Sequence, residues 1–530
     1  MFLILSASKD TYITNKIIDN VYRVTDTNIG VASTLDLFKL WDESSFIDGG
    51  TRVTSNVQEL SRLLVKFDYD RLDALLSSTL DVNHPSFKCT LKMFDINGGQ
   101  GVPSNFTMVC HPLSHSFDEG IGRDVISFKD IGTANFISAS YNSSTSTNNV
   151  WFTSGANASG SLGNINIDII ERDNVNSLDP LTPFFVKEQY FDTGRENLAI
   201  DVTTLVSSSL AGNLINHGFR LAFTSSQEWD HRTRFVKRFA SRHVSNRALR
   251  PRLEVVFDDS IIDHHKNFFF NVSGSLFLQN YRYGRSGNIQ SGTINDVGLI
   301  SLSPVTGQNC MILELVTGSF VTSSFVSTHT GSTTGVGIAG LYSASFCIPF
   351  LSGGQINSDN DTIFKFAQKS GSITFDTYWK SKDGGIGFHT GSLKIKTVDR
   401  SAFNVTAQRL ELIATNARPS YKKREKVKFR IFVNDLNEQA SAGRIPISIT
   451  SKILDEVYYS VRDVNSGDII IPFNITNNGT RLSTDSDGLF FEMYMEDLSD
   501  GRTYTFDFLI KDRGIEFVEP AANVAFEVKL

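Results

Sequence analysis

The sequence predicts an all-β protein, a multidomain chain of tandem β-sandwiches with a few short helices. Three observations predict this class. Phe is frequent, at 41 of 530 residues, Pro is scarce, at 12, and Ser, Thr and Asn are abundant. This mixture favours strands and polar loops over helices. Short apolar runs alternate with turn residues along the chain. The length also exceeds the roughly 250–300 residues that one core usually spans, which predicts about three domains.

The first predicted domain covers residues 1–259. Leu72, Leu75, Leu76 and Leu80 fall on one face of a short helix predicted over 69–80. A second helix is predicted over 201–210, with Asp201 as its N-cap. Alternating apolar runs predict strands at 1–5, 6–14, 35–40, 62–67, 87–94 and 218–223.

The end of this domain, residues 239–259, is predicted to be a hairpin. Its second arm, 251–257, has the dense apolar alternation of a buried strand. Pro251 suits the first position of a strand, where a missing N–H costs least. A closing strand of this kind needs partners made much earlier, and residues 1–70 can supply them.

The second predicted domain covers residues 260–400 and the third covers 401–530. In the second, strands are predicted at 268–270, 275–278, 311–316, 344–350, 363–366, 373–378 and 393–395. Gly-rich turns separate them at spacings typical of a sandwich. In the third, strands at 427–433, 457–461, 469–473, 490–495 and 504–510 predict an immunoglobulin-like sandwich without a disulfide.

Charge and cysteine content narrow the classes of partner. The net charge of −7 gives no reason to expect nucleic-acid binding. The four cysteines are far apart with no Cys-x-x-Cys spacing, so we expect buried thiols, no zinc and no disulfide framework.

No apolar run approaches the roughly 20 residues of a membrane span. The start of the chain lacks a basic region and a long apolar run, so we expect no signal peptide, no membrane partner and a soluble protein.

A search for catalytic motifs finds none, so we expect a protein that is not an enzyme and has no cofactor and no metal. Gly120-Ile121-Gly122 lacks a third glycine and predicts a plain turn. We expect tandem His264-His265 to be solvated and not a metal site. The carboxylates Asp487, Glu492, Glu496 and Asp497 lack the spacing of a calcium loop. Nothing in the sequence fixes Glu228 and Asp230 at the separation of a glycosidase pair.

The strongest functional signal is a basic run, which is the candidate partner-contact surface. Phe235 and Phe239 lie within it, and guanidinium groups near aromatic rings suit an acidic protein surface, an anionic glycan or nucleic acid. The alternative is that alternate basic residues line the solvent face of a hairpin and pair with nearby acids. The run consists of Arg232, Arg234, Lys237, Arg238, Arg242, Arg247, Arg250 and Arg252.

Several short motifs of the first domain resemble the DNRLRE family of β-sandwich domains, which is related to carbohydrate-binding modules. They are Ser6–Ile13, Asn28-Ile-Gly30, Leu35-Asp36-Leu37, Arg62–Asp68, Asp201-Val-Thr203, Gly218–Leu221, Phe239–His243 and Arg250–Leu253. The resemblance spans residues 1–259 and implies a jelly-roll-like sandwich. Modules of this kind stand beside catalytic domains of polysaccharide-degrading and surface proteins, and recur in virion proteins of tailed phages.

The C-terminal part is similar to the terminal module of virion structural proteins from T4-like cyanophages. The residues that carry this resemblance are 409–413, 421–433, 458–463, 469–473, 482–485, 490–495 and 502–510. It implies a virion component at the tail, baseplate or neck, assembled in the bacterial host cytoplasm. The expected partners are other virion proteins in a symmetric, multicopy assembly. The alternative is an adhesin that binds host polysaccharide, which solvent-exposed aromatics near Trp151, Trp229 or Trp379 would favour.

Overall fold

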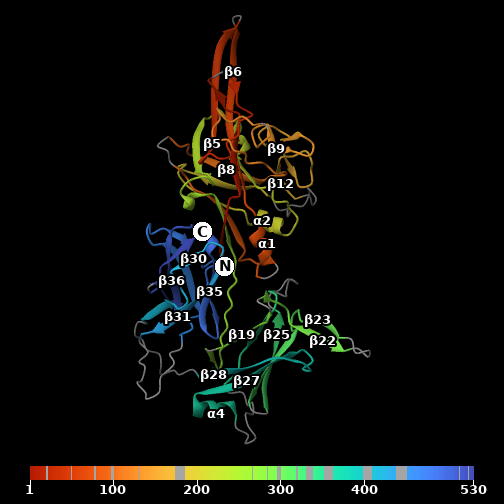
Figure 1. Cartoon of the computed structure of the whole chain (residues 1–530), viewed down its shortest axis with the longest axis vertical. Coiled ribbons are helices and arrows are strands. Elements are labelled where there is room, and N and C mark those ends of the chain that lie inside the picture. The colour runs from red at the N-terminus through yellow and green to blue at the C-terminus, as the bar shows by residue number, and fades with distance from the viewer. Residues whose placement is uncertain are drawn as a thin grey trace. The chain divides into compact units, whose positions relative to one another are not determined.

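The computed structural model confirms the predicted class: the chain is all-β, with β-sandwich architecture and a few short helices (Figure 1). No helix among the residues described below is long and apolar enough to cross a membrane. The structure describes residues 1–19, 22–48, 51–76, 79–96, 101–130, 132–173, 185–265, 267–282, 285–294, 300–317, 320–329, 338–350, 362–397, 409–436, 451–512, 514–522 and 524–530.

The chain divides into two compact units. One contains residues 3–71 and 87–256, and is called the arm unit below because it carries a long hairpin; the other contains 1–2, 72–86 and 257–530. The first predicted domain boundary, after residue 259, lies close to the point where the chain leaves the arm unit. The second, after residue 400, lies outside the described residues. The division into three domains stays a prediction.

Two sheets form the sandwich of the arm unit. The smaller has the strand order β1-β17-β7-β14, and the larger has the order β13-β8-β15-β6-β5-β16 with β2 also paired to β6. The smaller sheet comprises β1 (Phe2–Ser6), β7 (Lys88–Met93), β14 (Leu198–Asp201) and β17 (Arg252–Val256). The larger comprises β2 (Lys9–Thr14), β5 (Thr34–Asp48), β6 (Thr51–Lys66), β8 (Phe106–Pro112), β13 (Lys187–Phe191), β15 (Phe219–Phe223) and β16 (Arg234–Ala240).

The strand β17 is confirmed, and so is its dependence on an early partner, because β1 lies beside it in the sheet. The predicted hairpin is wrong. β16 pairs with β5 in the larger sheet, whereas β17 pairs with β7 in the smaller one. A 3₁₀ turn at Arg247–Leu249 lies on the connection that carries the chain from one sheet to the other. Neighbouring strands in sequence therefore belong to opposite layers of the sandwich.

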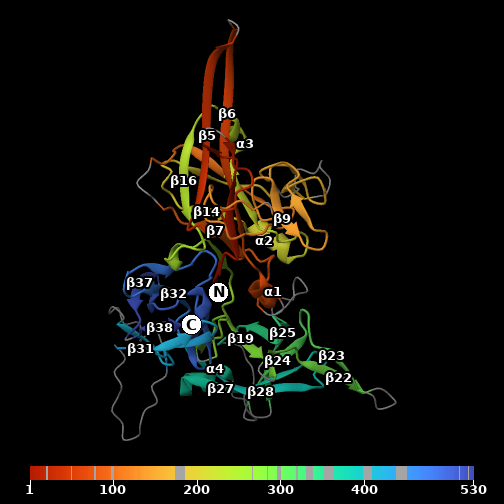
Figure 2. The same cartoon turned by 45° about the horizontal axis from the view of Figure 1, so that its top comes forward.

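The hairpin of β5 and β6 extends well beyond its neighbours in the larger sheet (Figure 1 and Figure 2). The partner strand β16 reaches only Lys39 on β5, and β2 reaches only Ser61 on β6. From Asp42↔Val57 to Asp48↔Thr51, the two strands pair with each other. We call residues 42–57 the hairpin arm. Among the described strands, no other one pairs with it.

Residues 113–172 form a lobe on the larger sheet. Its core joins Ile13 and Leu64 of the sheet to Phe117, Trp151 and Ile169 of the lobe. Strand content is low here, because a Ser-, Asn- and Gly-rich chain favours turns. The small ribbons of the arm unit are β3 (Ile17–Ile18) with β4 (Tyr22–Arg23), β9 (Ser138–Asn142) with β10 (Thr147–Val150), and β11 (Ser159–Ser161) with β12 (Ile169–Arg172).

Among the described residues of the arm unit there are two α-helices, α2 (Thr203–Leu210) and α3 (Ser225–Trp229). Helix α2 confirms the prediction, but the prediction of Asp201 as its N-cap is wrong. Asp201 ends strand β14, and its Oδ1 accepts a hydrogen bond from Thr203 N, while Val202 occupies the cap position. Short-range bonds of this kind are available to Asp in turns as well as in caps.

The central part of the second unit contains a seven-stranded sheet with the order β18-β28-β27-β24-β25-β26-β19. Its core includes Leu313, Phe375 and Leu393. The strands are β18 (Phe268–Phe269), β19 (Gly274–Gln279), β24 (Met311–Thr317), β25 (Phe320–His329), β26 (Leu341–Phe346), β27 (Ser372–Ser381) and β28 (Gly387–Lys396). Two ribbons accompany them: β20 (Tyr281–Arg282) with β21 (Arg285–Ser286), and β22 (Gln290–Ile294) with β23 (Ile300–Pro304).

The strand predicted at 363–366 is wrong, because Ile363–Ser370 is a helix, α4. The Thr362 hydroxyl caps it by accepting from Lys365 N, and Gly371, at φ +70°, ends it in the left-handed region. Ile363 and Ala367, four residues apart, are its buried positions. A strand has alternate buried residues, and this helix has buried residues one turn apart.

The C-terminal part of the second unit contains two sheets that form a β-sandwich, with the orders β29-β31-β35-β34 and β30-β38-β36-β32-β33; β37 pairs with β36. Phe429, Phe491 and Phe506 meet between the sheets at ring separations of 4.9–5.2 Å. The elements are β29 (Leu410–Ala414), β30 (Ser420–Lys422), β31 (Lys426–Asp435), β32 (Glu456–Asp463), β33 (Ile469–Ile471), β34 (Ser483–Asp485), β35 (Gly488–Tyr494), β36 (Thr503–Asp512), β37 (Ile515–Pro520) and β38 (Phe526–Lys529). The predicted helix near residue 70 is α1 (Asp70–Leu76).

Candidate functional site

Most of the basic run forms ion pairs inside the arm unit. The exposed side chains are those of Arg232 and Arg247, and the Arg250 guanidinium donates to Val244 O at 3.3 Å. The paired members and their partners are Arg234 with Asp230, Lys237 with Asp95, Arg238 with Asp36, Arg242 with Glu119, and Arg252 with Glu254. The contact surface as a whole stays a prediction; its buried members bind residues of their own chain.

Asp230 is held by two cations at the base of the hairpin arm. Arg234 Nη1 and Nη2 donate to its two carboxylate oxygens at 2.8 and 2.5 Å. Lys39 Nζ, fully buried, donates to Asp230 Oδ1 at 2.7 Å, to Asp230 O and to Arg232 O. Burial alone would raise the pKa of Asp230, but these hydrogen bonds hold it well below the ordinary value. The loop 230–232 is therefore fixed to β5.

Arg238 and Arg242 each bind a carboxylate through two parallel hydrogen bonds. Arg238 contacts Asp36 at 2.7 and 2.6 Å, and Arg242 contacts Glu119 at 2.6 and 2.8 Å. Hydrogen bonds to these carboxylates raise the pKa of both guanidinium groups. Two-point pairs of this geometry are the strong class of ion pair. The Arg238 pair joins β16 to β5, and the Arg242 pair joins the segment after β16 to the lobe.

One carboxylate and imidazole group has the spacing to hold a metal ion within the described part of the chain: Asp10, Glu119 and His243. Glu119 Oε1 already accepts from Asp10 N at 3.0 Å and from Arg242 Nε at 2.6 Å, and lies 3.3 Å from His243 Nε2. A cation there would have to displace the Arg242 guanidinium, so this group acts as a clamp between chain segments. Asp10 is fully buried, and burial raises its pKa to about 7.

A second buried charge cluster surrounds Glu228. Arg62 Nε and Nη2 donate to its two oxygens at 3.0 and 2.6 Å, and Arg220 Nη2 lies 3.9 Å from Glu228 Oε1. Burial and the charge of Arg62 lower the pKa of Arg220 to about 9. Because Glu228 and Asp230 are both engaged in ion pairs, the structure does not place them as an acid and nucleophile facing a common groove.

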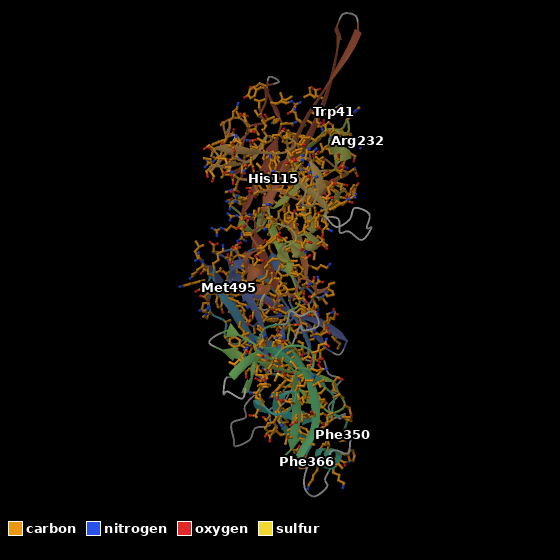
Figure 3. All side chains as sticks on the ribbon, turned by 90° about the vertical axis from the view of Figure 1, so that its right-hand side faces the viewer. Trp41, His115, Arg232, Phe350, Phe366 and Met495 are labelled. Carbon is orange, nitrogen blue, oxygen red and sulfur yellow. The ribbon has the colours of Figure 1, made fainter. Side chains whose placement is uncertain are left out.

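Trp229 lies between these two anchored carboxylates and is 64% exposed. Nearby, Trp41 stacks on His231 with ring centroids 4.6 Å apart, and Trp41 N donates a hydrogen bond to the Thr233 hydroxyl oxygen at 3.0 Å. Figure 3 labels Trp41 and Arg232 near the base of the hairpin arm, where Trp41 N donates to Thr233, the residue after Arg232. An exposed tryptophan on a rigid support is suited to stacking on a ligand.

Sequence reasoning did not single out Trp41, Lys39 or Arg62. A lysine or arginine at an alternating strand position reads as solvent-facing, and only the three-dimensional pairing shows that it is buried. Of the other tryptophans, Trp151 and Trp379 are buried in cores, at 3% and 4% exposure.

The remaining sequence candidates lie apart from this site. Gly120-Ile121-Gly122 is a turn bound by the Asn28 side chain, whose Oδ1 accepts from Gly122 N at 2.8 Å. His264 Nδ1 accepts from Ser275 N at 3.1 Å. Among the four C-terminal carboxylates, Glu492 pairs with Lys426 at 2.6 Å and Asp487 faces Arg430 at 3.8 Å. These four do not form a group with metal-ligand spacing in the described structure.

No protein-family model and no curated protein matches the sequence. Comparison with solved structures returns a titin substructure at 7% identity, covering 51% of this chain and 94% of that one, with a TM-score of 0.13. It also returns the D00-D0 domain of intimin (11% identity, 50% and 96% coverage, TM-score 0.12) and extracellular cadherin domains of protocadherin gamma B7 (10%, 55% and 62%, TM-score 0.13). TM-scores of this size do not establish a common fold over the chain.

Proposed function

We propose that this chain is a non-enzymatic virion structural protein of a tailed bacteriophage, a component of the tail, baseplate or neck. The hairpin arm is the observation that carries the proposal. Its strands pair with each other over residues 42–57 and, among the described strands, with no other. Both outer edges of such a ribbon offer unpaired N–H and C=O groups. A two-stranded ribbon on its own is marginally stable in water, and pairing with a neighbouring protein would complete its sheet.

The interior of the arm unit supports a structural role. Its buried charges are used to fix loops to strands, as Lys39 fixes residues 230–232 and Arg242 binds Glu119. Such pairs favour one defined arrangement of segments. The C-terminal sequence motifs that resemble cyanophage virion proteins agree with this role. Other virion proteins in a symmetric assembly are the proposed partners.

The first test is immunogold labelling of purified particles, with mass spectrometry of their proteins. We expect peptides of this chain and label at the tail or neck. A shortened variant tests the arm: residues 43–56 are replaced by Asn-Gly, which joins the paired residues Asp42 and Val57 through a two-residue turn. We expect this variant to fold with an unchanged circular dichroism spectrum and to be missing from particles. Normal incorporation would contradict the role of the arm, and absence of the wild-type chain from particles would contradict the function.

A second candidate function is a carbohydrate-binding adhesin, and the exposure of Trp229 favours it. Trp229 should then stack on a sugar ring, and its fluorescence should change on titration with host-surface polysaccharide. Trp229→Ala should abolish this change, while Trp379→Phe, a substitution in a buried core, should leave it. A flat titration of the wild-type protein would remove this candidate.

A further inference from the structure

The most unusual buried group of the arm unit is the Lys237 amine. Lys237 is on β16, and its side chain is fully buried. Its Nζ lies 2.5 Å from Asp95 Oδ1, 2.9 Å from Gly194 O and 2.8 Å from Glu196 O. Asp95 is nearly buried as well, with 9% of its side chain exposed. An amine and a carboxyl group are thus held in contact away from water.

Two aromatic rings also lie beside the amine. The rings of Phe191 and Phe239, both fully buried, have their centroids 5.3 and 4.9 Å from Lys237 Nζ. Burial lowers the pKa of Lys237, although the hydrogen bond to Asp95 opposes this shift. Desolvation brings a lysine closer to its neutral form, which is the nucleophile. Burial also keeps water away from the lysine and the carboxyl group, so water does not compete with the amine for the carboxyl carbon.

A third functional group is close to the pair. The charge of the Glu196 carboxylate acts on Lys237, and Glu196 is on the turn that also supplies the Gly194 carbonyl. Its Oε1 accepts from Thr193 N and Thr193 Oγ1, both at 2.8 Å. Its Oε2 is buried with no hydrogen-bond partner in the described structure. Desolvation opposes the shift, but the hydrogen bonds from Thr193 lower the pKa of Glu196 to about 2, so this carboxylate stays ionised and supplies negative charge near Lys237.

We propose that Lys237 and Asp95 react to form an intramolecular amide bond, an isopeptide cross-link. A proton first passes directly from the Lys237 ammonium to Asp95 Oδ1, along the hydrogen bond of 2.5 Å that joins them. The neutral amine adds to Asp95 Cγ, and a second proton then passes from Nζ to the departing oxygen, which leaves as water. The third proton stays on the new amide. An ammonium and a carboxylate become an amide and one water, so no oxidant, activating group or cofactor is consumed. Holding the reactants in contact supplies the effective concentration that the uncatalysed reaction lacks.

The position of this bond gives it a mechanical consequence. Asp95 follows β7 of the smaller sheet, and Lys237 is on β16, the edge strand of the larger sheet. The cross-link would join the two layers of the sandwich covalently, across 142 residues of sequence. The inference is independent of the proposed function, because a covalently closed sandwich is useful to any protein that bears load.

Lys39 provides an internal comparison. It is also fully buried and lies 2.7 Å from a carboxylate oxygen, that of Asp230. However, Arg234 binds both oxygens of Asp230, which holds this carboxyl group ionised, and 30% of the Asp230 side chain is exposed. An ionised, hydrated carboxylate is a poor acceptor for an amine. We therefore expect one cross-link, at Lys237, and none at Lys39.

Intact-mass measurement of the purified full chain tests the proposal. The expected mass is that of the sequence minus one water, with tandem mass spectra of a digest joining the peptides that contain residues 95 and 237. Asp95→Asn should lose one ammonia in place of one water, because the leaving group changes with the side chain. Glu196→Gln retains the oxygen that Thr193 binds and removes a negative charge that favours the protonated form of Lys237, so this variant should fold and still lose one water. A wild-type mass equal to that of the unmodified sequence overturns the proposal, and so does water loss that persists in Lys237→Met.

Discussion

At the scale of single residues, Asp10 links the stability of the arm unit to pH. Burial raises its pKa from 3.8 to about 7. The folded protein therefore holds a proton that the unfolded chain releases, so the stabilisation is complete below pH 4 and is lost as pH rises to about 7. Asp10→Asn, which can still accept the Arg242 N–H bond, removes this loss. We expect the variant to gain on the order of 2–4 kcal/mol over wild type at pH 8.

Urea unfolding at pH 5 and pH 8 measures this difference. The gain should shrink at pH 5, where the wild-type carboxyl group of Asp10 is protonated in the folded protein. Asp118→Asn is the matched control, because Asp118 is 46% exposed and its contact with Lys9 is long, at 3.5 Å. A gain that is the same at both pH values would show that Asp10 does not titrate in this range.

Glu228 should be far more sensitive than an acid at the surface. It compensates Arg62 and Arg220, and all three side chains are nearly fully buried. Glu228→Gln leaves two guanidinium groups in the interior without a counter-charge, which costs about 3–5 kcal/mol. Glu527→Gln, beside Lys529 at the surface, should change stability by less than about 0.5 kcal/mol. Chemical denaturation measures the loss of stability in each variant. Comparable losses in the two variants would contradict the assignment of Glu228 as a buried counter-ion.

The basic run shows what residue patterns do and do not reveal. Its charge and its interleaved phenylalanines could be read from the sequence, and so could the alternative that acids nearby pair with it. The identity of those acids could not. Asp36 and Asp95 lie 202 and 142 residues from their partners Arg238 and Lys237. Only the pairing of strands from distant parts of the chain brings such charges together.

At the scale of elements, some turns that follow strands and helices need glycine, because the backbone there has a positive φ or lies close to another segment. Gly194, in the turn between β13 and β14, has φ +76°, and a Cβ there would lie 1.8 Å from Pro103 O. Gly212, which follows α2, has φ +77° and open space around the same position. Gly212→Ala should cost about 1 kcal/mol for the left-handed backbone alone. Gly194→Ala should cost several times more, because backbone must move. Thermal unfolding of the two variants compares them, and equal losses would contradict the close approach.

Strand prediction succeeded where burial alternates over a long run. The run VKFRIFV at 427–433 is such a case, since β31 has alternating buried residues along its length. It failed at residues 363–366, where four residues with two phenylalanines do not distinguish a strand from a helix. The distinguishing features lie at the ends of the segment, at Thr362 and Gly371. It failed for the 239–259 hairpin because a local pattern specifies a strand but not the strand beside it.

At the scale of the whole molecule, the chain does not fill its two units in sequence order. Residues 72–86 belong with 257–530, although the chain before and after them belongs to the arm unit. This excursion includes α1, in which Leu72 and Leu75 are buried. A fragment of residues 1–259 contains the sandwich of the arm unit, but it lacks most of the unit in which α1 is counted.

We therefore expect the 1–259 fragment to fold and to expose an apolar helix face that the full chain covers. Burying a leucine is worth about 1.5–3 kcal/mol, so the uncovered pair favours self-association. The fragment should bind the dye ANS and sediment as an oligomer. The double substitution Leu72→Ser and Leu75→Ser should reduce both dye binding and self-association, while the strand signal in circular dichroism persists. The same double substitution in the full chain should instead destabilise the second unit. Equal and low dye binding by the fragment and its variant would show that α1 packs within the arm unit, and that the sequence order of the chain does match its division into cores.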